Sequence, residues 1–156
     1  MNAESDKPSV SPPPYKQPDF TLLGEEHVQR YQETDGEVGY IWNGVPILLL
    51  TTTGRRSGAA RTTPLIHGRD GDDYLVVASM GGAPRHPYWY ENLLADPSAR
   101  IQVLGEHIEV MARTASEAER SRLWRIVSDL WPNYDVYQSR TDRVIPIVVL
   151  SPSPGG

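Results

Sequence analysis

Residues 45–65 read VPILLLTTTGRRSGAARTTPL, and this stretch decides the fold. Residues 47–53 are apolar and then β-branched, a composition that suits a strand at the centre of a sheet. Gly54 and Gly58 follow and predict a turn, because glycine adopts positive φ without steric cost. The stretch therefore predicts two strands joined by a short loop.

Three arginines crowd that loop: Arg55, Arg56 and Arg61. A guanidinium group presents a planar fork of donors that fits phosphate and carboxylate. Glycine lets backbone N–H groups approach the same anion. The loop is a candidate anion cradle at the rim of a sheet. A solvated hairpin turn is the plainer interpretation, and the loop alone leaves both open.

Composition excludes several classes of protein. With 156 residues the chain is long enough for one domain with its own core. A net charge of −5 argues against a nucleic-acid-binding protein, which needs a basic surface. The count of 0 cysteines excludes disulfides, thiol nucleophiles and Fe–S clusters. The four histidines, His27, His67, His86 and His107, are dispersed without metal-ligand spacing, so no metal site is expected.

Residues 1–19 are rich in proline, serine and charge, which predicts a disordered, polyproline-like tail before a domain of residues 20–152. The start has no apolar segment of the kind that secretory signals carry. No run approaches the length that spans a bilayer. We therefore expect a cytoplasmic protein without stable membrane insertion, for which peripheral membrane contact stays open.

The rest of the chain alternates helices with short strands. We expect helices at 24–34, at 88–95 and from a capping box at Ser116 and Glu119, with a further helical turn or two at 133–138. Strands are expected at 62–69, 73–79, 100–104, 107–114 and 145–150. Short strands joined by hairpins predict an α+β fold built around a barrel.

A second candidate site lies between the strand at 73–79 and the helix at 88–95. Residues 79–87 read SMGGAPRHP, so a Gly-Gly loop leads into a helix N-terminus, where backbone N–H groups are exposed. An ordinary strand-to-helix connection has the same composition. Motifs for nucleotide binding, serine hydrolysis and zinc proteolysis are absent from the sequence. Chemistry supplied by a cofactor is the natural remainder.

Four motifs in fixed order resemble one family. They are LLLTTTGRRSG at 48–58 with Arg61, ASMGGAP at 78–84 running to PYWYENL at 87–93, PNYDVYQ at 132–138, and RVIP at 143–146. Together they resemble the deazaflavin (F420)-dependent nitroreductase family of actinobacteria. The resemblance extends from the first helix to the last strand.

This resemblance implies a split β-barrel of the FMN-binding type with flanking helices. It implies binding of coenzyme F420, an 8-hydroxy-5-deazaflavin, and hydride transfer to an organic acceptor such as a quinone, nitroaromatic compound or activated enone. In the family pattern Arg55, Arg56 and Arg61 hold the phosphate and oligoglutamate tail. The deazaflavin contacts fall on Pro64, Leu65, Ser79, Met80, Gly81, Gly82, Ala83 and Trp89. The candidate catalytic residues are Tyr134, Tyr137 and Ser79.

Two positions depart from the family pattern. Met80 stands where many relatives have lysine, and Trp131 stands where nitro-reducing relatives often have tyrosine. The acceptor, and nitro reduction in particular, therefore stays open. A non-catalytic carrier or sensor, and a split barrel that binds FMN or haem, are the alternatives. The expected partner is a small organic acceptor, and the protein is expected to be a monomer or homodimer.

Overall fold

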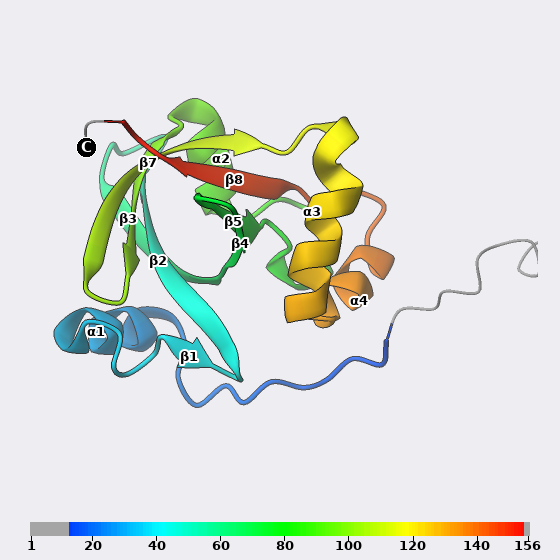
Figure 1. The fold of residues 1–156 in the computed structure, drawn as a ribbon, viewed down its shortest axis with the longest axis horizontal. Helices are drawn as coiled ribbons and strands as arrows, with labels where there is room; N and C mark the ends of the chain where they lie inside the picture. Colours follow the sequence, from blue (N-terminus) through cyan, green and yellow to red (C-terminus); the bar gives the residue numbers. More distant parts are fainter. Residues whose placement is uncertain (1–12, 155–156) are drawn as a thin grey trace, which may run out of the picture.

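A curled antiparallel sheet forms the core of the molecule (Figure 1). The computed structural model describes residues 13–154. The strands are β1 (Ile41–Trp42), β2 (Val45–Thr53), β3 (Ala60–Ile66), β4 (Gly68–Asp70), β5 (Asp73–Val77), β6 (Ser98–Val103), β7 (Glu106–Thr114) and β8 (Ile147–Pro152). They pair in the order β1-β2-β6-β7-β8-β5-β4, and β3 pairs with β2. The predicted α+β split barrel is confirmed.

Strand β2 lies inside the sheet, with partners on both sides. It pairs with β1, β3 and β6, and its apolar residues alternate between two cores. Leu48 and Leu50 point into the barrel, whereas Ile47 and Leu49 pack on the other face with Tyr31. This alternation is the two-residue period of a strand. One strand thus joins the barrel interior to the helix that covers its outside.

Within the described part of the chain, four helices and one 3₁₀ turn surround the sheet. They are α1 (Gly24–Thr34), α2 (Tyr88–Ala95), α3 (Glu117–Leu130), α4 (Asn133–Ser139) and the turn η2 (Met80–Gly82). Helix α1 contacts β3, α2 contacts β2, α3 lies on β4, β5 and β8, and α4 lies beside η2. Helices α1 and α3 therefore flank opposite sides of the curled sheet (Figure 1).

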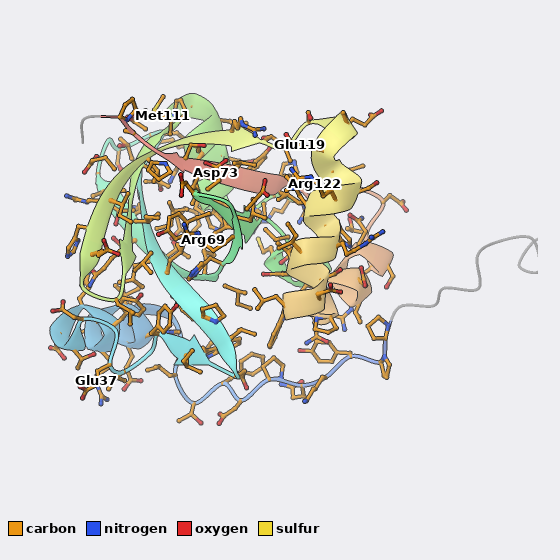
Figure 2. The ribbon with its side chains drawn as sticks, viewed as in Figure 1. Glu37, Arg69, Asp73, Met111, Glu119 and Arg122 are labelled. Atoms are coloured by element: carbon orange, nitrogen blue, oxygen red, sulfur yellow. The ribbon has the colours of Figure 1, made fainter. Side chains whose placement is uncertain are left out.

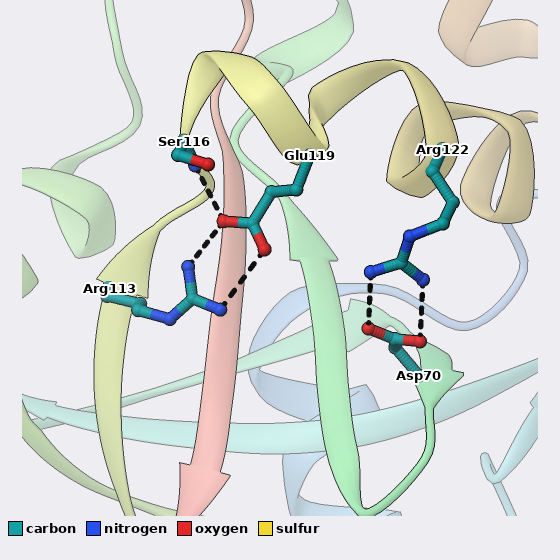
Figure 3. A network of polar contacts seen from close by, with 5 residues as sticks. All are labelled: Asp70, Arg113, Ser116, Glu119 and Arg122. Atoms are coloured by element: carbon teal, nitrogen blue, oxygen red, sulfur yellow. Dashed lines mark hydrogen bonds and ion pairs between the residues drawn. The ribbon is translucent and has the colours of Figure 1, made fainter.

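Exposed charges fix the start of α3, where the capping box is confirmed. Glu119 accepts a hydrogen bond of 2.7 Å from the Ser116 N–H and pairs with Arg113 (Figure 3). Arg113 is the main reason that the pKa of Glu119 falls to about 2. One turn later, Arg122 reaches Asp70 of β4 at 2.9 Å. In Figure 2, Glu119 and Arg122 lie on the α3 side of the molecule, and Glu37 lies on the opposite side, beside α1.

Several predicted strand boundaries are wrong, and two of the differences have a clear cause. The strand expected at 62–69 is divided at His67, because β3 pairs with β2 whereas β4 pairs with β5. The last strand begins at Ile147 and not at 145, because the Ile145 N–H donates to the Gln138 side chain at 2.9 Å. Strand β1, which pairs with the start of β2, is not among the strands predicted from the sequence.

The predicted tail differs from the structure in its second part. Residues 1–12 lie outside the described residues, whereas residues 13–19 lie extended against the domain. Lys16 bonds through its backbone to the side chain of Asn133, and Asp19 bonds in the same way to Asn43. Among residues 13–154, no helix has the length and apolar character needed to cross a bilayer.

Candidate functional site

Two cavities share strand β3 and the start of α2. The first, the arginine cavity, has a volume of about 440 Å³ and is lined by Gly54, Arg55, Arg56, Ser57, Arg61, Tyr88 and Asn92. The second, the aromatic cavity, measures about 430 Å³. Arg61 and Pro64 of β3 lie in different cavities, as do Tyr88 and Trp89 of α2. The two cavities are therefore neighbours.

The loop between β2 and β3 is a tight turn with little freedom. The Gly54 N–H donates to the Ala59 carbonyl at 2.7 Å, and the Gly58 N–H donates to the Gly54 carbonyl at 2.8 Å. Gly58 has a φ of +73°, and a Cβ on Gly54 would lie 2.9 Å from the Ser57 hydroxyl oxygen. Both glycines are thus required by the turn that presents the arginines.

The three arginines differ in how they are held. Arg55 pairs with Glu91 at 3.0 Å, and its backbone N–H donates to the buried Asn92 at 3.1 Å. Arg56 and Arg61 form no ion pair within residues 13–154. Two guanidinium groups are therefore open to an anionic ligand, and the third is shared with a carboxylate.

The aromatic cavity lies where the barrel is split, between β3 and the end of β5. Its predicted wall residues are Pro64, Leu65, Ser79, Met80, Gly81, Trp89, Tyr134 and Tyr137. Strand β3 is an edge here, since it pairs with β2 alone. An edge strand tolerates Pro64, which has no N–H to donate.

The turn η2 supplies the polar face of this cavity. Met80 has a φ of +47°, and Gly81 and Gly82 follow with +66° and +86°. The N–H groups of Gly82 and Ala83 are satisfied within the turn, whereas those of Met80 and Gly81 form no backbone bond in the described part of the chain. These two N–H groups are donors available to an electron-rich ligand.

Gly82 and Ala83, both predicted to contact the coenzyme, line neither cavity. Gly82 is packed beneath α4 instead, where a Cβ would lie 2.6 Å from the Tyr137 carbonyl oxygen. This glycine therefore sets the distance between η2 and α4.

Arg143 holds the η2 region and was not predicted as a site residue. It donates to the carbonyls of Ser79 and Ala83, each at 2.8 Å, and to that of Ala78 at 3.2 Å. It also donates to Nδ1 of His86 at 3.0 Å. Burial and the Arg143 charge lower the pKa of His86. The signal for Arg143 is its place in the RVIP motif.

Tyr134 is buried at the first turn of α4, and it lines the aromatic cavity. Burial, with a smaller contribution from Tyr137, raises the pKa of its phenol well above the usual range. Its hydroxyl forms no hydrogen bond with another residue in the described part of the chain, and the residue lines the cavity. Tyr134 therefore stays protonated and can donate a hydrogen bond into the cavity.

Several further wall residues were not predicted as site residues: Pro18, Phe20, Leu23, Gly24, His27, Trp42 and Trp131. His27 is buried, and its Nε2 donates to the Gly39 carbonyl at 2.8 Å. Trp42 and Trp131 lie with ring centroids 5.7 Å apart. Within residues 13–154, no cluster of side chains has the composition of a metal site.

Comparison with known proteins identifies the family. The family model of the F420H(2)-dependent quinone reductases matches residues 23–152. An F420H(2)-dependent quinone reductase of Mycobacterium tuberculosis is 46% identical over 129 residues, covering 80% of this chain and 87% of that protein. The chain belongs to this family. The predicted resemblance, the reductase class and coenzyme F420 are confirmed.

Solved structures agree with this assignment. An F420H(2)-dependent reductase, FDR-A, has a TM-score of 0.64 and 38% identity, covering 68% of this chain and 94% of its own. A structure described as a domain-swapped dimer has a TM-score of 0.66 and 35% identity, covering 81% and 95% of the two chains. Both contain the split barrel seen here.

Proposed function

We propose that this chain transfers a hydride from reduced coenzyme F420 to an uncharged, flat acceptor of the quinone class. The observation that carries the proposal is the shared wall of the two cavities. The same strand and the same helix start place open arginines beside an aromatic chamber. That combination fits a ligand with an anionic tail at one end and a flat ring at the other.

The residues of the arginine cavity fit the tail. Arg56 and Arg61 are free for phosphate and carboxylate groups, and Arg55 adds its charge while Glu91 orients it. Charge-assisted hydrogen bonds of this kind are about 2.7–2.9 Å long and stronger than neutral ones. We assign these three residues to the coenzyme tail.

The residues of the aromatic cavity fit the ring. The N–H groups of Met80 and Gly81 suit its carbonyl edge, and Pro64, Leu65 and Trp89 supply apolar walls. Ser79 lies next to these two residues in the chain. Arg143 donates to the Ser79 carbonyl and so fixes the backbone at the start of this turn. When bound, the coenzyme supplies a hydride donor that the protein itself lacks.

Tyr134 and Tyr137 are assigned to the acceptor. Hydride addition to a quinone leaves negative charge on an oxygen, which a positioned donor stabilises. Tyr134 lines the cavity and its hydroxyl bonds to no other residue among 13–154, so its raised pKa makes it a donor of a hydrogen bond that keeps its own proton. Tyr137, with its ring centroid 6.1 Å from that of Tyr134, forms the adjoining wall.

The lining favours a neutral acceptor. His27 is the one lining residue with an ionisable basic side chain, and the rest are apolar, aromatic or glycine, apart from the Ser79 hydroxyl. A flat, uncharged ring loses little by leaving water for such a chamber. A homodimer is a further proposal, supported by the domain-swapped neighbour and tested by sedimentation at several concentrations.

Turnover with a water-soluble quinone tests this function. We expect the purified chain to oxidise the reduced coenzyme only when the quinone is present. Tight binding of the coenzyme without turnover would instead support a non-catalytic carrier. Nitroaromatic compounds in parallel reactions test whether a protein with Met80 and Trp131, the two departures from the family pattern, also reduces nitro groups.

A further inference from the structure

Two asparagine side chains hold the N-terminal segment by its backbone. Asn133 accepts from the Lys16 N–H at 3.0 Å and donates to the Lys16 carbonyl at 2.8 Å. Asn43 accepts from the Asp19 N–H at 2.7 Å and donates to the Asp19 carbonyl at 2.9 Å. Each amide thus pairs with one residue as a strand partner would, although neither belongs to a strand that runs beside the segment.

The segment between these contacts lines the aromatic cavity. Pro18 is buried there, and Phe20 and Leu23 line the cavity with exposed fractions of 47% and 48%. We name residues 13–23 the strap. It forms part of the cavity wall. In Figure 1 it runs in blue from the α4 side of the molecule to α1.

The strap is attached by side chains and not by the sheet. Among the described residues, no backbone–backbone hydrogen bond joins residues 13–22 to the barrel. Besides the two asparagines, the Trp42 ring donates to the Leu22 carbonyl at 2.9 Å, and Tyr15 packs between Tyr137 and Arg140. Releasing such contacts leaves every sheet pair intact, so the strap can move without unfolding the barrel.

Each asparagine is also the chain neighbour of a cavity wall residue. Asn43 follows Trp42, and Asn133 precedes Tyr134. A ligand that displaces the ring of Trp42 or Tyr134 therefore also displaces the neighbouring asparagine that holds the strap. The arginine cavity, in contrast, contains no strap residue.

We propose that the strap is the movable outer wall of the acceptor site, and that Asn43 and Asn133 are the positioning residues that set its closure. The inference rests on the proposed function, because it concerns how the acceptor enters and fits. Closure of the strap controls the KM for the acceptor and leaves coenzyme affinity unchanged.

The sequence offers a direct probe of strap opening. The chain has lysine at Lys7 and Lys16 alone, and Lys7 is followed by Pro8, a bond that lysine-specific proteases resist. Such a protease therefore cuts the folded protein at Lys16, the residue that Asn133 holds. When opening and closing are fast, the cleavage rate follows the population of the open strap.

The first experiment measures that rate with oxidised coenzyme and a water-soluble quinone, a pair that cannot turn over. We expect the quinone to slow cleavage about fivefold or more, because occupancy of a closed chamber favours the closed state. Coenzyme alone is expected to leave the rate within twofold. A rate that the quinone leaves unchanged would overturn the proposal.

The second experiment uses variants. Asn43→Ala and Asn133→Ala should each speed cleavage and raise the quinone KM about three- to tenfold, the loss expected for one or two hydrogen bonds. Coenzyme Kd should stay within twofold. Asn133→Asp, which keeps an acceptor and loses the donor, should fall between. Gln29→Ala on the exposed face of α1 is the matched control.

These outcomes separate the inference from the proposed function. Faster cleavage with an unchanged KM would make the asparagines structural ties only and overturn the proposal. Asn133 is buried, and Asn43 has a φ of +50° that alanine tolerates poorly, so either alanine variant can lose stability. Asn43→Gly removes the amide and tolerates that φ, so it gives the decisive result. Absence of quinone turnover by the wild-type chain would refute the proposed function, whereas its protease rates would still report whether the strap opens.

Discussion

The two cavities are built in different ways. The arginine cavity takes five of its seven residues from one loop and the strands beside it, residues 54–61. The aromatic cavity gathers its wall from the strap, α1, four strands, η2, α2 and the turn before α4, together with α4 itself. Charge recognition is therefore local in the sequence, whereas the shape of the reaction chamber is a property of the whole fold.

The largest effect should come from the joint between η2 and α4. Gly82→Ala should lower the free energy of unfolding by about 2–4 kcal/mol, from strain at positive φ and a clash with the Tyr137 carbonyl. Gly81→Ala is the matched control, because its added Cβ meets open space, and it should cost about 1 kcal/mol. Denaturant titration measures both. Equal losses would show that packing against α4 contributes nothing.

The sequence predicted more of the arginine cavity than of the aromatic cavity, because local residues build the first and distant segments build the second. The arginine loop could be predicted because its residues are contiguous and its glycines indicate a turn. Tyr134 and Tyr137 were found through a family motif. The strap could not be found, because proline-rich composition indicates disorder and gives no sign that Asn43 and Asn133, distant in sequence, pair with its backbone.

Strand boundaries show the same limit. The helices at 24–34 and 88–95 agree with the prediction to the residue, since capping and breaker residues are local signals. The break at His67 is not local, because it depends on which neighbour each half of the predicted strand pairs with. Partner choice in a sheet is set by the fold and not by the strand's own residues.

The next largest effect concerns charge. Arg56→Ala and Arg61→Ala should each weaken coenzyme binding by about 1.5–3 kcal/mol, the value of one charge-assisted hydrogen bond. Arg55→Ala should cost less, because Glu91 already shares that charge. Calorimetric titration at low and high salt measures these losses, which should shrink as salt rises. Arg30→Ala on α1 is the control. If the loop variants lose no more coenzyme affinity than this control, the loop is a turn that does not bind the coenzyme.

A pH titration separates stability from the site. His67 is buried outside both cavities with an unpartnered Nδ1, and burial with the nearby Arg69 charge lowers its pKa to about 4. The unfolded chain binds the proton more readily, so stability should fall as pH drops from about 6.5 toward 4, by roughly 2 kcal/mol.

His67→Phe keeps the aromatic contacts with Tyr40 and Tyr74 and should flatten this pH dependence. Thermal melts of both proteins across that range make the comparison. An equally steep loss in the variant would assign the effect to other groups.

The smallest of these effects concerns the Tyr134 hydroxyl. Tyr134→Phe keeps the aromatic wall and removes the donor, so hydride transfer in a single turnover should slow by about tenfold or more. Coenzyme Kd should change little, because the variant keeps the aromatic ring against the cavity and leaves the arginine cavity, which holds the coenzyme tail, untouched. Tyr137→Phe is the neighbouring comparison. An unchanged rate of hydride transfer in the Tyr134 variant would show that this residue only forms part of the cavity wall.

The measurement that tests the division between a charge-binding cavity and a ring-binding chamber most directly is a paired titration. Coenzyme F420 and FMN both present a flat ring, and FMN lacks the oligoglutamate tail. We predict that coenzyme F420 binds well above FMN, and that Arg61→Ala narrows the difference. Binding of FMN equal to or tighter than that of coenzyme F420 would contradict the assignment of the arginine cavity.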